Sequence, residues 1–120
     1  MTVGIAASVA NGWVDGLGTL YAKLHTGDPG AAGTTAASAE TTRKAMTFGS
    51  ASAGVATQTG TVSWTAWTAG SETISHVSYW TASTGGTFQG SFALSASKSV
   101  ANTDTLNLAS CTISATPVAA

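Results

Sequence analysis

The first hydrophobic residues of the chain recur at helical spacing. Positions three or four apart are apolar, which places one apolar stripe along a helix. The glycines between them weaken the helix, since each costs about 1 kcal/mol relative to alanine. We therefore predict a short helix over residues 5–17 that depends on docking against the rest of the protein. Its apolar stripe comprises Ala6, Val9, Ala10, Trp13, Val14 and Leu17.

The hydrophobic period changes to two over residues 20–25. Leu20, Ala22 and Leu24 alternate with more polar neighbours, as in a half-buried strand. Asp28 and Pro29 follow between glycines, and this composition is typical of a turn. Residues 31–42 are mostly Ala, Thr, Ser and Gly without a period. We expect a long loop or arm there that contacts a neighbouring subunit, because such loops are usually functional or ordered by a partner.

Short segments of β-branched and aromatic residues recur over the rest of the chain, separated by Gly, Ser, Ala or Asn. Two of them, 74–80 and 87–94, flank Gly85 and Gly86 and predict a hairpin. The sequence shows neither an internal repeat nor a heptad pattern. The further strands are predicted at residues 44–48, 55–59, 61–64, 105–108 and 112–116.

These elements predict the fold class. With 120 residues, the chain has room for one core. We predict a single domain over residues 1–120 that is mainly β. It is an antiparallel β-sandwich or barrel of about seven to eight short strands over residues 20–118, preceded by the short N-terminal helix.

Composition adds one unusual property, a scarcity of charge. Hydrophobic residues make up 43% of the chain, but charged residues only 8%, where soluble proteins average about 25%. The surface must therefore consist of Ser, Thr, Ala and Gly. Because the cores of protein interfaces are depleted in charge, we expect neighbouring polypeptides to cover much of this surface. A small secreted β domain with a Ser/Thr-rich exterior is the alternative.

Several function classes receive no support from the sequence. The net charge is −1 with four Lys and Arg residues in all, which argues against nucleic-acid binding. No basic residue precedes Lys23, so we expect no secretory signal. No apolar run approaches the length of about 18 residues that crosses a bilayer. The single cysteine, Cys111, excludes an internal disulfide and is expected to be a buried hydrophobe. We expect the protein to remain in the cytoplasm until it assembles.

Residues that carry catalytic chemistry are few. His25 and His76 are the only histidines, and neither has the spacing of a metal site. The five carboxylates are isolated in sequence. Asp28 and Asp104 are expected to form turns by accepting hydrogen bonds from nearby backbone N–H groups. We therefore predict no catalytic, cofactor-binding or metal-binding residues and no enzymatic activity.

The tryptophans suggest binding surfaces, because exposed aromatic rings stack on sugars or form the centres of interfaces. Trp67 lies in a predicted turn, so we expect it to be exposed. Stacking of Trp67 on a glycan is the alternative use of this ring, as in a lectin or a small hydrolase. The residues predicted to contact neighbouring subunits are Trp13, Asp28, Pro29 and Trp67.

Four blocks of the sequence carry a resemblance to a known family. They are residues 20–34, Arg43 with 46–49, residues 74–76 with 80–88, and residues 104–106. Through the order of these blocks, the chain resembles small virion proteins of tailed phages, especially phages of actinobacteria. Such proteins are variously called minor capsid, head decoration or tail-fibre proteins. The resemblance implies a virion component without catalytic residues.

Two placements on the particle follow. Our first hypothesis is a capsid decoration or cement protein, made in the host cytoplasm, that binds the outer face of the head shell. Its partners would be the major capsid protein and copies of itself, with a trimer favoured by analogy. The alternative is a tail, baseplate or fibre-tip component that contacts the host surface. A decoration protein predicts hundreds of copies per particle, and a tail component predicts few.

Overall fold

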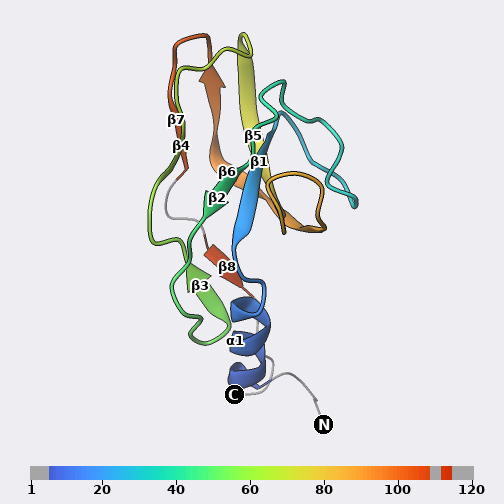
Figure 1. The fold of residues 1–120 in the computed structure, drawn as a ribbon, viewed down its shortest axis with the longest axis vertical. Helices are drawn as coiled ribbons and strands as arrows, with labels where there is room; N and C mark the ends of the chain where they lie inside the picture. The colour runs from blue at the N-terminus through green and yellow to red at the C-terminus, as the bar shows by residue number, and fades with distance from the viewer. Residues whose placement is uncertain (1–5, 109–111, 115–120) are drawn as a thin grey trace.

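The computed structural model describes residues 6–108 and 112–114. Within these residues the protein is mainly β, as predicted, with eight strands and one short helix (Figure 1). The elements are α1 (Ala7–Asp15), β1 (Leu20–His25), β2 (Lys44–Met46), β3 (Val55–Thr57), β4 (Val62–Trp64), β5 (Glu72–Trp80), β6 (Phe88–Val100), β7 (Leu106–Leu108) and β8 (Thr112–Ser114).

The largest unit is a four-stranded antiparallel sheet in the order β2-β1-β5-β6. Strands β5 and β6 form the hairpin predicted around the Gly-Gly turn. Strand β6 continues to Val100. The prediction ended it at Leu94, because residues 95–99 lack the apolar alternation that marks a strand. The remaining four strands form two separate pairs, β4 with β7 and β3 with β8. The strands do not close into a ring, so the barrel alternative is wrong.

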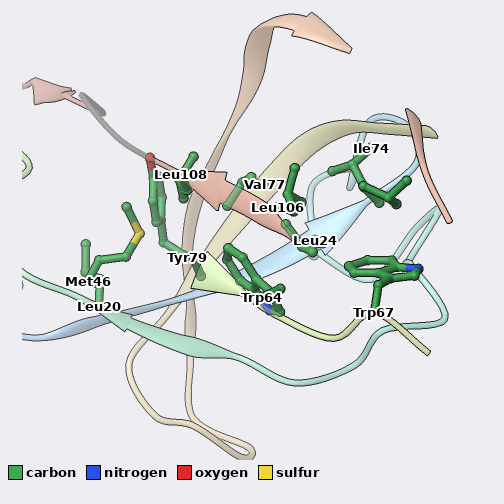
Figure 2. Packing of buried hydrophobic residues seen from close by; sticks show 12 residues of the cluster. Leu20, Leu24, Met46, Trp64, Trp67, Ile74, Val77, Tyr79, Leu106 and Leu108 are labelled. Carbon is green, nitrogen blue, oxygen red and sulfur yellow. The ribbon is translucent and has the colours of Figure 1, made fainter. Parts of the chain in front are cut away.

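The core lies between the four-stranded sheet and the β4–β7 pair. Figure 2 shows Trp64 and Leu106 of that pair close to Leu24 and Val77 of the sheet. All four side chains are buried. Two antiparallel layers that enclose one apolar core form an open sandwich. Its extents are 53 × 27 × 27 Å, with α1, β3 and β8 at one end of the long axis (Figure 1).

Helix α1 docks through polar bonds as well as apolar contacts. The side-chain oxygens of Asn11 and Asp15 accept hydrogen bonds from the backbone N–H groups of Gly54 and Ala51, at 2.6 and 2.8 Å. Ala10 and Val14 are buried. The predicted apolar stripe is therefore divided: Leu17 is partly buried against the core, whereas Val9 is 45% exposed and Trp13 is 58% exposed. Residue 5, where the helix was predicted to begin, lies outside the described part.

Candidate functional site

Residues 26–42 form a loop that returns alongside β1. Its backbone pairs with the end of that strand: Thr26 N–H donates to Ala36 O at 2.8 Å, and Ser38 N–H donates to Leu24 O at 3.1 Å. The loop is also bonded to β5, because the hydroxyl of Ser38 donates a hydrogen bond to the Glu72 carboxylate at 2.8 Å. The segment predicted as a loop or arm is thus bound to its own sheet over much of its length.

A buried polar network fixes the middle of this loop. His25 Nδ1 lies 2.9 Å from the carbonyl oxygen of Thr35, and His25 Nε2 lies 2.7 Å from Ser78 Oγ. The indole N–H of Trp80 donates to the same Ser78 oxygen at 2.8 Å. His25 and Ser78 are fully buried. Each polar group has a partner, so the network stabilises one loop conformation.

The ring of Trp80 continues the contact toward the β5–β6 turn. The guanidinium of Arg43 lies 4.2 Å from the centre of that ring, within cation–π range. Its Nη1 also donates to the carbonyl oxygens of Ala82 and Gly85, at 3.0 and 2.6 Å. The rings of Trp80 and Phe88 are also neighbours, with their centres 5.6 Å apart. Arg43 therefore connects the start of β2 to the turn at residues 81–87.

Gly33 closes the gap between the two loops. Its φ is +71°, and a Cβ atom there would overlap the ring of Phe88. Both observations require a glycine, because residues with a side chain rarely adopt a positive φ and no space exists here for a Cβ atom. We call the loop 26–42, the turn 81–87, and the side chains of His25, Arg43, Ser78, Trp80 and Phe88 between them the loop cluster (Figure 1).

The outer surface of the loop cluster carries few charges. Residues 26–42 and 81–87 are mostly Thr, Ala, Gly and Ser, and their ionic residues are Asp28 and Glu40. Asp28 Oδ1 accepts a hydrogen bond from Gly30 N–H at 2.9 Å, which confirms its role in the turn. Asp104 Oδ2 likewise accepts from Ala101 N–H at 2.8 Å. The cluster presents hydroxyl and backbone groups on a fixed scaffold.

Two of the four predicted interface residues are not on the surface. The expectation that Trp67 is exposed is wrong: it is 1% exposed, its ring joins the core (Figure 2), and its indole N–H donates to Gly70 O at 2.8 Å. The turn exists, but backbone hydrogen bonds to Thr103 and Asp104 hold the ring inward. Pro29 is also fully buried. A glycan cannot stack on a ring in this position.

The other two predicted interface residues are exposed, at separate places. Asp28 lies on the loop cluster, and Trp13 lies on α1. The sequence reasoning did not detect the pairs Arg43–Trp80 and His25–Ser78. Arg43, His25 and Trp80 all belong to the blocks that carry the family resemblance, so the order of the blocks was the available signal. In the fold, three of the four blocks contribute to the loop cluster.

Across 6–108 and 112–114, no three His, Cys, Asp or Glu side chains gather where they could hold a metal ion. No helix within those ranges is long and apolar enough to cross a membrane.

Comparison with models of protein families identifies a related family. The model of a family described as Podophage GP4 fiber I protein gp80 matches residues 15–116. That range includes the whole loop cluster and all eight strands. A search of curated proteins gave no match.

Proposed function

The chain belongs to the Podophage GP4 fiber I protein gp80 family, whose model matches most of its length, and we propose that it is a non-enzymatic module of a phage fibre. Membership makes the protein a phage structural protein and a component of the virion. The match over residues 15–116 is the observation that carries the proposal. It favours the tail-fibre alternative over the capsid-decoration hypothesis, because the family description names a fibre.

One end of the module supplies an attachment surface in this proposal. Trp13 and Val9 are one turn apart on α1 and are 58% and 45% exposed. Large exposed apolar side chains that lie together often mark contact sites between proteins. We assign this end to contact with neighbouring virion proteins. The assignment keeps the predicted role of Trp13 and of the N-terminal helix.

The loop cluster supplies the surface that contacts the host. Binding residues are commonly carried on loops that a rigid scaffold positions. The His25 network and the Arg43 contacts hold both loops in one conformation, so little conformational entropy is lost when a partner binds. The hydroxyl and backbone groups of this surface suit a polar, uncharged partner on the cell envelope.

The number of copies per particle tests the fibre assignment. Purified virions are separated on a denaturing gel, and the band of this protein is compared with the band of the major head protein. A fibre module predicts few copies per particle, because a particle carries few fibres. Hundreds of copies, in a fixed ratio to the head protein, would instead support the capsid-decoration hypothesis.

A further inference from the structure

Loop 26–42 lies on the four-stranded sheet without contributing to the core. Figure 1 shows it beside β1 and β5, on the side of the sheet away from the β4–β7 pair. No residue of this loop belongs to the core cluster, and its buried residues are Pro29, Gly33 and Ser38. Segments with few buried apolar contacts open at a lower free energy than the core beneath them. The loop can therefore detach while the sheet remains folded.

The ring of His25 joins the sheet to the middle of this loop. Successive side chains of a strand point to opposite faces, so Leu24 enters the core whereas His25 lies on the outer face, under the loop. Its Nδ1 meets the carbonyl oxygen of Thr35, and its Nε2 meets the hydroxyl of Ser78 on β5. His25 and Ser78 are fully buried. Water therefore reaches the His25 ring when the loop moves away.

The closed loop requires the neutral form of the His25 ring. A neutral imidazole donates through one nitrogen and accepts through the other, which matches the Thr35 carbonyl and the Ser78 hydroxyl. A protonated ring donates through both nitrogens. The proton of the Ser78 hydroxyl would then lose its acceptor, because the other partner of that oxygen, the indole N–H of Trp80, only donates. Protonation therefore leaves a buried hydroxyl unsatisfied and places a charge where no water solvates it.

The charged groups around His25 do not compensate a positive charge on its ring. Burial is the largest cause that lowers the pKa of His25, and the hydrogen bond to Thr35 raises it. Lys23, two residues earlier on β1, and His76, directly opposite on β5, lower this pKa further. A third cation, Arg43, precedes β2. The carboxylates of the loop and of β5 accept hydrogen bonds from other groups: Asp28 from Gly30, Glu40 from Thr42, and Glu72 from Ser38 and Ala39.

We propose that loop 26–42 is an acid-sensitive switch: protonation of His25 releases the loop from the outer face, while the four-stranded sheet and the core stay folded. The open loop exposes the ring to water, which solvates its charge. Opening is thus coupled to the uptake of one proton, so the opening equilibrium rises by about tenfold for each pH unit of acidification. The rise begins below about 6.5, the ordinary pKa of the imidazole, and ends at the lowered pKa of His25 in the closed form.

Release of the loop also changes the rest of the loop cluster. Gly33 lies against the ring of Phe88 in the closed form, so opening removes a neighbour of the β5–β6 turn. The surface that contacts the host in the proposed function is then complete at neutral pH and incomplete in acid. This last consequence rests on that function, whereas the opening itself is measured on the isolated protein. Failure of the switch and failure of the proposed function can therefore be told apart.

Hydrogen exchange of the full-length protein, followed by mass spectrometry from about pH 7.5 to about pH 5, tests the switch. The N–H groups of Thr26 and Ser38 donate to Ala36 and Leu24 and report the closed loop, whereas peptides from β5 report the sheet. After correction for the intrinsic pH dependence of exchange, protection of the loop is expected to fall by about tenfold per pH unit below about 6.5, with β5 unchanged. Loop protection that does not depend on pH, or loss of protection in loop and sheet together, would overturn the proposal.

Lys23→Gln separates the switch from general acid sensitivity. The variant removes a charge that lowers the pKa of His25, so the closed form accepts the proton more readily. The total loss of loop protection in acid is then expected to be smaller than in the wild type. Lys98→Gln, exposed on β6, is the matched control and keeps the wild-type response. His25→Gln is expected to lose the pH dependence, and circular dichroism checks that it folds. An unchanged response of Lys23→Gln contradicts the proposal even if His25→Gln does not fold.

Discussion

The imidazole of His25 and the hydroxyl of Ser78 form a fully buried hydrogen bond, with Nε2 and Oγ 2.7 Å apart. The carbonyl oxygen of Thr35 can only accept, so His25 Nδ1 carries the proton in that contact. Nε2 of the neutral ring then accepts from Ser78, whose oxygen accepts from Trp80. This arrangement uses the neutral imidazole and holds the loop 26–42 on the sheet.

Acid is expected to destabilise the protein through His25. Burial lowers the pKa of the His25 imidazole from its ordinary value of 6.5, and the charge of Lys23 lowers it further, against the backbone hydrogen bond to Thr35, which raises it. The native state therefore binds a proton less readily than the unfolded state. The contribution of neutral His25 to stability is complete above about pH 6.5. It decreases as the pH falls below that value toward the lowered pKa of His25 in the folded protein.

Thermal unfolding followed across this pH range measures the effect. Tm of the wild type is expected to fall with acidification, whereas His25→Gln is expected to show a flatter dependence from a lower starting Tm. Lys98→Gln, which removes an exposed cation and leaves the hydrogen bonds of His25 in place, is the control and should keep the wild-type slope. Equal slopes for His25→Gln and wild type would contradict the assignment.

Gly33→Ala is expected to destabilise the loop cluster by about 1–3 kcal/mol, since it combines positive φ with an overlap on Phe88. Gly85→Ala is the control, because Gly85 has a similar φ of +65° but open space around it. Urea unfolding of both variants separates the two causes. If Gly85→Ala costs as much as Gly33→Ala, contact with Phe88 is not what requires a glycine.

Arg43→Lys is expected to cost about 1–2 kcal/mol of unfolding free energy, because an ammonium group cannot stack flat on Trp80 while donating to the turn carbonyls. Lys98→Gln removes an exposed cation and is expected to change stability by no more than about 0.5 kcal/mol. Urea unfolding monitored by tryptophan fluorescence compares them. If Arg43→Lys leaves the free energy of unfolding unchanged, the stacking of Arg43 on Trp80 contributes nothing to stability.

Replacement of Trp67 by alanine is expected to lower stability, whereas replacement of Trp13 is expected to lower incorporation into particles. Trp67→Ala removes a ring that is 1% exposed and should cost about 3–5 kcal/mol of stability. Trp13→Ala removes a ring that is 58% exposed, so the isolated protein should keep its stability while incorporation into particles falls. Calorimetry of the purified variants and immunoblots of complemented virions measure the two effects. Normal incorporation of Trp13→Ala would remove α1 from the attachment surface.

The sequence was most informative where one side of an element is buried. Strand β1 has the predicted bounds, because Leu20 and Leu24 alternate with half-buried residues. Strand β6 was predicted to end at Leu94, since an edge strand with a largely exposed second half needs no apolar alternation. Trp67 was predicted to be exposed because a turn usually is, but long-range bonds to Thr103 and Asp104 decide which way its ring points.

The candidate site was less accessible from sequence than the fold. Asp28 and Asp104 were identified because each bonds to backbone two or three residues away, which local sequence can indicate. The contacts of the loop cluster join residues far apart in the chain, such as Arg43 with Gly85. No local pattern encodes such a pair. Only the order of the family blocks pointed to this group of residues.

The position of the protein on the virion tests the central claim most directly. Purified phage particles are labelled with gold-conjugated antibody fragments raised against the purified protein and imaged by electron microscopy. Assignment to a fibre predicts gold along the fibres of the particle and none over the head shell. Gold distributed over the head would contradict that assignment.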